Sequence, residues 1–205
     1  MELSTLLHTF YQNLLDTGWL EFVAVIFGLL SVWFARKENI WVYPTGIINV
    51  LIYVFLCFSA GLYADMGINA FYFLMSVYGW YRWTHRDADD QQLPITDLTK
   101  KGWLLCLGAT LIFYFLIRYV LIRFTDSKVP DFDSFTTALF ILGMWLMAIK
   151  KIENWIFWII GDALVIPLFA YKGLAFTGVQ YLVFLALAIM GYLEWKKRLQ
   201  PSVAG

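Results

Sequence analysis

The sequence predicts an all-α membrane protein with seven transmembrane helices in a 3+1+3 arrangement of parallel repeats. Three observations lead to this fold class: the apolar composition, seven apolar stretches, and a similarity of the chain to itself. Of the 205 residues, 61% are hydrophobic, 20% aromatic and only 15% charged, whereas soluble domains are ~45–50% apolar and ~25% charged. This composition excludes an ordinary soluble globular protein.

Seven apolar stretches approach the length of about 20 residues that a helix needs to cross a bilayer. They are residues 19–35, 41–59, 66–83, 102–121, 134–149, 155–171 and 177–195. Upstream of the first stretch, apolar residues from Leu3 to Leu15 recur at helical spacing. They predict a helix in the membrane interface over residues 1–18, with an extension of the first span as the alternative.

The chain also resembles itself when it is aligned with its own second half. In one register of this alignment, Gly28 meets Gly143; after a small deletion in the next loop, a second register brings Gly79 onto Gly191. Two parallel three-helix repeats around one central span explain these matches, with an axis along the membrane normal. The predicted parts are the interfacial helix (1–18), the first repeat (19–83), a linker with the fourth span (84–133), the second repeat (134–195) and a basic cytoplasmic tail (196–205).

Basic residues are distributed unevenly between the two sides of these spans. Eleven of the 15 Lys and Arg residues fall on the side that holds the breaks 36–39, 84–101 and 150–154 and the C-terminus. Cytoplasmic loops of membrane proteins are enriched in Lys and Arg. We therefore expect the N-terminus outside and the C-terminus in the cytoplasm.

No pattern in the sequence indicates a common enzyme or cofactor site. The chain lacks P-loop, dinucleotide-binding and HExxH patterns, and 15 basic residues balance 15 acidic ones, so there is no basic excess for nucleic acid. Cys57 and Cys106 lie in apolar runs and are predicted to be buried thiols. We expect no catalytic residues, no metal, no cofactor and no nucleic-acid partner.

Polar groups inside a bilayer are costly and mark candidate sites. Asp162 lies within the sixth span, and Trp155 and Trp158 precede it on the same helical face. Indole faces attract a cationic ring, although tryptophans near a membrane surface are also typical of the interfacial belt, and Asp162 could be a structural acid. The other candidates can hydrogen-bond an amide or a sugar: Asn49, Tyr53, Asn69, Tyr72 and Gln180.

Four runs, 38–46, 60–65, 78–83 and 153–158, contain a repeated Glu-Asn pair and a Trp-x-x-Trp element. Through them the chain resembles the nicotinamide riboside transporter (PnuC) family of bacterial inner membranes, over roughly residues 19–198. The resemblance implies a 3+1+3 fold related to the SWEET architecture and a homotrimer in the lipid bilayer. It also implies uptake of the unphosphorylated vitamin B3 nucleoside by facilitated diffusion with alternating access.

The resemblance further implies that Trp155 and Trp158 pack against the nicotinamide ring. Asn69 and Tyr72 match an Asn-x-x-Tyr element, and Gln180 stands where a polar contact is expected. Two alternatives stay open: a related transporter of thiamine or riboflavin, and a membrane enzyme that acts on a nucleoside with Asp162 as base. Against the enzyme, no nucleophile or metal ligand is evident beside Asp162; the same carboxylate could instead couple transport to protons.

Overall fold

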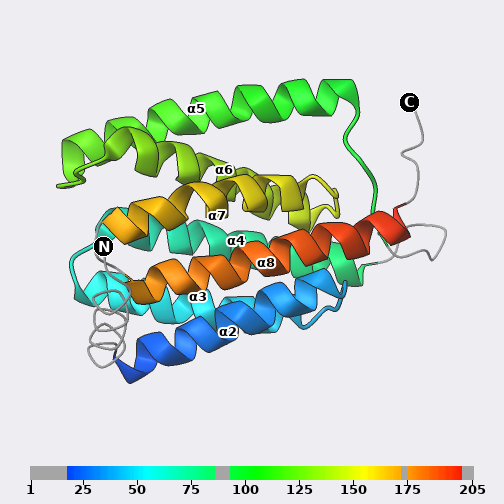
Figure 1. The fold of residues 1–205 in the computed structure, drawn as a ribbon, viewed down its shortest axis with the longest axis horizontal. Coiled ribbons are helices and arrows are strands. Elements are labelled where there is room, and N and C mark those ends of the chain that lie inside the picture. Colours follow the sequence, from blue (N-terminus) through cyan, green and yellow to red (C-terminus); the bar gives the residue numbers. More distant parts are fainter. Residues whose placement is uncertain (1–17, 86–92, 172–174, 200–205) are drawn as a thin grey trace.

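The computed structural model describes residues 18–85, 93–171 and 175–199. Seven helices make up this part of the chain (Figure 1): α2 (Trp19–Arg36), α3 (Val42–Ser59), α4 (Tyr63–Thr84), α5 (Lys100–Phe124), α6 (Pro130–Ala148), α7 (Asn154–Tyr171) and α8 (Ala175–Arg198). Their bounds lie within a few residues of the seven predicted spans, which confirms the all-α class. The interfacial helix expected over residues 1–18 lies outside the described residues, and Lys196–Arg198 belong to α8 rather than to a tail.

Four of these helices are long and apolar enough to cross a membrane by length and composition: α2, α3, α5 and the part of α8 from Thr177 to Arg198. Large apolar side chains cover their outer surfaces. On α5, for example, Leu104 is 72% and Ile112 is 67% exposed, which is expected of groups that face lipid. The chain is therefore a multi-pass membrane protein.

Local signals explain where two of the helices begin. The Thr99 side chain accepts a hydrogen bond from Gly102 N at 3.2 Å and caps α5. Pro130 opens α6, where its fixed φ suits the first turn and no N–H is needed, and Asp131 and Asp133 complement the positive end of the helix dipole. The start of each of these helices is thus specified locally.

Six of the helices form a closed ring. α2 packs against α3, α3 against α4, α4 against α6, α6 against α7, α7 against α8, and α8 against α2. α5 lies outside the ring against α6 and, over a smaller contact, α4; Figure 1 shows it at one edge of the molecule, far from α2. The triplets α2–α4 and α6–α8 therefore meet along two seams, α2–α8 and α4–α6.

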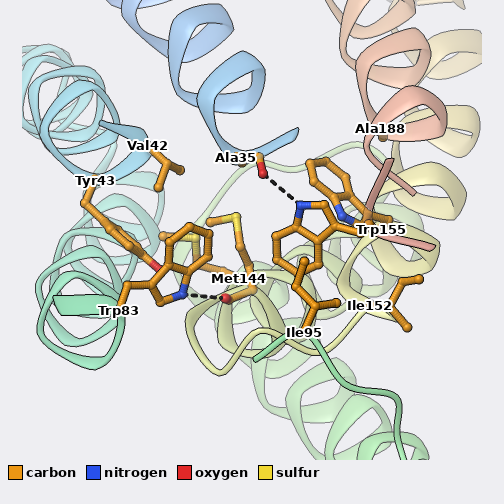
Figure 2. Close-up of a cluster of buried hydrophobic side chains, with 11 residues drawn as sticks. Ala35, Val42, Tyr43, Trp83, Ile95, Met144, Ile152, Trp155 and Ala188 are labelled. Atoms are coloured by element: carbon orange, nitrogen blue, oxygen red, sulfur yellow. Dashed lines mark hydrogen bonds between the residues drawn. The ribbon is translucent and has the colours of Figure 1, made fainter. Parts of the chain in front are cut away.

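The two seams are built alike. At the α4–α6 seam, Trp83 Nε1 donates a hydrogen bond to Met147 O at 3.3 Å. At the α2–α8 seam, Trp195 Nε1 donates to Ala35 O at 2.9 Å, and Figure 2 shows both bonds. In the second register of the self-alignment, the one that brings Gly79 onto Gly191, the two donors coincide, and so do the two acceptors.

Contacts inside the triplets follow the same register. A Cβ on Gly79 would lie 2.5 Å from the Tyr43 ring, and a Cβ on Gly191 would lie 2.6 Å from the Trp155 ring. Glycine lets the aromatic ring rest on the neighbouring helix in both places. Because both rings rest on matching glycines, Trp155 is the counterpart of Tyr43. The first register, which brings Gly28 onto Gly143, does not align these two residues.

We call the end of the ring that holds the turns 37–41 and 149–153 the basic end, because five basic side chains gather there: Arg36, Lys37, Lys150, Lys151 and Arg198. Large buried side chains fill this end (Figure 2): Tyr43, Trp83, Met144, Trp155 and Trp195. Each is at most 8% exposed. The helix ends are thus closed by a packed hydrophobic cluster.

The segment before α5 docks onto the basic end. Thr96 N donates to Lys150 O at 3.1 Å, and Ile152 N donates to Thr96 O at 2.9 Å, which makes an isolated parallel bridge. Ile95 is 2% exposed and belongs to the buried cluster (Figure 2). Residues 93–98 therefore cover the turn at the start of α7.

Glu153 holds this segment in place. It is 5% exposed, and its Oε1 accepts a hydrogen bond from Leu98 N at 2.8 Å. Loss of a charged acceptor from a buried N–H costs roughly 1.5–3 kcal/mol, so Glu153→Ala should raise hydrogen exchange in residues 93–98 by about tenfold or more. Glu153→Gln keeps an oxygen acceptor and should stay near wild type. Equal exchange rates in all three proteins would contradict this role.

Candidate functional site

Stacked aromatic rings from three helices meet inside the second triplet. Phe140 of α6 stacks on Trp158 of α7 with ring centroids 5.3 Å apart and on Tyr181 of α8 at 6.2 Å. Tyr181 also stacks on Phe169 at 5.1 Å and meets Phe184 edge-on at 5.7 Å. We call these five residues the aromatic cluster.

Polar groups from both triplets lie within electrostatic range of Tyr181. Tyr181 interacts electrostatically with Asp162 of α7 and Tyr53 of α3, and Tyr72 of α4 interacts with Tyr181. Asp162 is 2% exposed. Three of the predicted site residues, Tyr53, Tyr72 and Asp162, therefore lie near Tyr181 of the aromatic cluster.

Trp155 lies elsewhere. Its ring is 1% exposed, meets Trp195 edge-on at 5.6 Å and rests on Gly191 of α8. Among the described residues, no acceptor faces its indole N–H. Trp155 thus belongs to the packed cluster at the basic end, while Trp158 belongs to the aromatic cluster.

Two glycines make room for the rings of the aromatic cluster. A Cβ on Gly143 would lie 3.1 Å from Trp158 Nε1, so the indole lies against α6. A Cβ on Gly161 would overlap the ring of Phe140. Gly161 thus leaves the space that the Phe140 ring occupies, and Gly143 lets the Trp158 indole lie close to α6.

In the first triplet, the contact that corresponds to Phe140 on Gly161 has the glycine on the first helix and the larger residue on the second. Asn49 of α3 lies over Gly28 of α2, whose added Cβ would be 3.0 Å from Asn49 Nδ2. That amide donates to Ala24 O at 2.7 Å and so ties α3 to α2. Phe184 also reaches Gly28, since the added Cβ would lie 3.7 Å from its Cζ. Asn49 and the aromatic cluster therefore meet at the α2–α8 seam.

The remaining two predicted residues are half-buried. Asn69 Nδ2 donates to Asp65 O within α4 at 2.9 Å. Gln180 lies on α8 beside Tyr181 in the sequence. One N–H of the Asn69 amide is thus used inside its own helix.

No pattern in the sequence singles out Phe140 or Phe169. The spans that hold them are apolar on all faces, so no periodic pattern marks the face that points inward. A signal existed for two other members of the cluster, because Tyr181 and Phe184 occupy the positions of Asn69 and Tyr72 in the second register of the self-alignment. The same register places Phe140 opposite Gly28.

The arrangement favours a flat, positively charged ligand. The cluster presents aromatic faces, which attract cations by ~0.5–2 kcal/mol and more when water is excluded. Asp162 can balance a positive charge or accept hydrogen bonds from hydroxyl groups. In the described part of the chain, no three His, Cys, Asp or Glu residues are grouped as metal ligands.

The chain is similar to known membrane transporters. The model of the family described as nicotinamide mononucleotide transporter matches residues 18–197. The nicotinamide riboside transporter PnuC of Escherichia coli (strain K12) is 28% identical, with 88% of this chain and 86% of that protein covered. The riboflavin/roseoflavin transporter RibM of Streptomyces davaonensis is 24% identical, with 86% and 84% covered. A crystal structure of the vitamin B3 transporter PnuC superposes with a TM-score of 0.70 at 25% identity, over 94% of this chain and 88% of that one.

Proposed function

Because the chain belongs to the nicotinamide mononucleotide transporter family, we propose that it carries nicotinamide riboside across the membrane by facilitated diffusion with alternating access. Its relatives are named as transporters, which agrees with the expectation of a transporter rather than an enzyme. The observation that carries the proposed substrate is the aromatic cluster beside the buried carboxylate of Asp162.

The residue types at the site support a nucleoside over its phosphate ester. Among the described residues, the ring contacts of Tyr181 are with Phe140, Phe169 and Phe184, and its electrostatic partners are the acid Asp162 and the phenol of Tyr53. A phosphate group needs basic side chains or helix N-termini as partners, and the side chain of Asp162 is not such a partner. The riboside, with a positive ring and no phosphate, suits this environment.

The two triplets supply different chemistry, which supports an asymmetric substrate. The second triplet provides stacked rings from Phe140, Trp158 and Tyr181. The first provides the phenols of Tyr53 and Tyr72, with the amides of Asn49 and Asn69 as further candidates. We propose that the nicotinamide ring lies toward the second triplet and the ribose toward the first, with Gln180 as a further polar contact.

The proposal extends to architecture and orientation. We infer that the triplets are internal repeats, since the hydrogen bonds at the two seams coincide in one register of the self-alignment. The excess of Lys and Arg at the basic end supports a cytoplasmic location for that end. The homotrimer implied by the family resemblance stays a prediction, which the mass of the purified protein in detergent would check.

A binding panel on the purified protein tests the substrate. Nicotinamide riboside should bind, whereas nicotinamide mononucleotide, thiamine and riboflavin should bind at least about tenfold more weakly, which corresponds to ~1.4 kcal/mol. Riboflavin is the informative competitor because RibM is a relative. Binding of riboflavin or thiamine in place of the riboside would overturn the proposed substrate.

An uptake assay in sealed vesicles distinguishes a carrier from an enzyme and from a proton-coupled transporter. Labelled nicotinamide riboside should equilibrate across the membrane chemically unchanged, and collapse of the pH gradient should leave this equilibration intact. Conversion of the riboside would indicate an enzyme. Uptake that follows the pH gradient would indicate proton coupling through Asp162.

A further inference from the structure

Two residues at the basic end contact their own counterparts in the other triplet. Lys150 Nζ lies 2.7 Å from Glu38 Oε1, and these residues coincide in the second register of the self-alignment. The rings of Trp83 and Trp195, which coincide in the same register, lie 6.0 Å from each other. Between two repeats related by a two-fold axis, a residue can contact its own counterpart only beside that axis. Both contacts therefore lie where a path between the triplets would leave the ring.

The Glu38–Lys150 ion pair is largely shielded from solvent. The side chain of Lys150 is 4% exposed and that of Glu38 is 23% exposed. Lys150 Nζ also lies 4.6 Å from the centre of the Trp83 ring, so the ion pair rests directly on the tryptophan contact. Arg198 approaches Glu38 Oε2 at 3.4 Å from the outer side.

The backbone at these two positions is held in an unusual conformation. Glu38 has φ of 56° and Lys150 has φ of 52°, and among the described residues they are the non-glycine residues with positive φ. The left-handed conformation is unfavourable for a residue that carries a Cβ. Each of these residues lies in the turn between the first and second helices of its triplet, and their charged side chains meet across the two triplets.

We propose that the Glu38–Lys150 ion pair and the Trp83–Trp195 contact beneath it form a gate that closes the basic end of the transport path. The inference rests on the proposed transport function. A substrate that moves between the triplets must leave past these two contacts, because both bridge the triplets at the axis. Opening this end therefore requires Glu38 to separate from Lys150 and the two indole rings to part.

A buried cysteine reports the opening without any substrate. Met144 is 8% exposed and lies in the cluster with Trp83 and Trp155 (Figure 2). In a background with Cys57→Ala and Cys106→Ala, the variant Met144→Cys should react slowly with a water-soluble maleimide. Neutralising one partner, by Glu38→Gln or Lys150→Gln, should raise that rate by about tenfold or more, because an unpaired buried charge favours the open, hydrated state.

The swap Glu38→Lys with Lys150→Glu restores the ion pair and should return the labelling rate most of the way to that of the background. Arg118→Gln is the matched control, since the Arg118–Asp131 ion pair joins α5 to α6 away from the axis, and it should leave the rate unchanged. Unchanged labelling in both single variants, or no restoration by the swap, would overturn the gate.

A cross-link gives a second measurement should the single variants not fold. Glu38→Cys with Lys150→Cys, joined by a short bifunctional thiol reagent, should bind nicotinamide riboside but no longer carry it across vesicles. Continued uptake after complete cross-linking would disprove the gate. Absence of uptake by the wild-type protein would instead disprove the proposed substrate, while the Met144→Cys labelling would still decide the gate.

Discussion

Trp158→Ala should weaken the binding of nicotinamide riboside by about ten- to a hundredfold while the protein stays folded. Trp158 is half-buried and stacked on Phe140, so its indole is part of the aromatic cluster beside Asp162. Stacking on an aromatic side chain contributes about 1–3 kcal/mol per base in nucleic-acid complexes, and each 1.4 kcal/mol is a factor of about ten. Titration calorimetry on the purified protein measures this loss.

Trp155→Ala should act on stability instead. Its ring is 1% exposed between Gly191 and Trp195, and removal of a buried tryptophan side chain costs about 3–5 kcal/mol. We expect a large fall in melting temperature in detergent. Trp158→Phe is the control for the first variant, because it keeps an aromatic face and should retain most of the affinity.

The two tryptophan variants thus separate the roles that the sequence assigned jointly. Affinity unchanged in Trp158→Ala would refute the aromatic cluster as the ring site. A strong loss of affinity in Trp155→Ala, with its melting temperature preserved, would place the substrate at the basic end of α7 instead.

Gly161→Ala should disrupt the aromatic cluster by displacing the ring of Phe140. Its Cβ would overlap the ring of Phe140, and overpacking of this kind typically costs about 1–3 kcal/mol. Because Phe140 is stacked between Trp158 and Tyr181, the displaced ring should disturb both neighbours. We expect a lower melting temperature together with weaker binding of nicotinamide riboside.

The double variant Gly161→Ala with Phe140→Leu tests the cause. A smaller, flexible side chain should relieve the overlap and recover the melting temperature, but affinity should stay low because the stacked ring is gone. Gly108→Ala is the matched control, since a Cβ there meets no atom within 4 Å, and it should leave both properties unchanged. A double variant no more stable than Gly161→Ala would rule out the Phe140 overlap as the cause.

The helices could be predicted from the sequence because the interior of a lipid bilayer restricts a single apolar segment to a helix. Backbone N–H and C=O groups have no water to bind inside lipid, so an apolar stretch of about 20 residues must form a helix there. The bounds of α2 and α7 accordingly match the predicted spans to within one residue. The polar breaks between spans end the helices for the same reason.

The neighbours of each helix could not be predicted in this way. When all faces of a helix are apolar, the sequence carries little information on which face points inward. Trp155 and Trp158 are only about 60° apart around α7, from its 3.6 residues per turn. α7 lies between α6 and α8, so even this small angle directs the two rings to different helices.

The sequence by itself therefore determined the class, the spans and the residue types of the site, because lipid penalises every polar group and unpaired backbone. Only the tertiary structure decided which aromatic rings meet. That depends on small residues between neighbouring helices of each triplet: Gly161 admits Phe140, Gly191 admits Trp155, and Gly28 admits Asn49. Small residues let neighbouring helices approach closely, and which large side chain each of them meets is decided only when the helices pack.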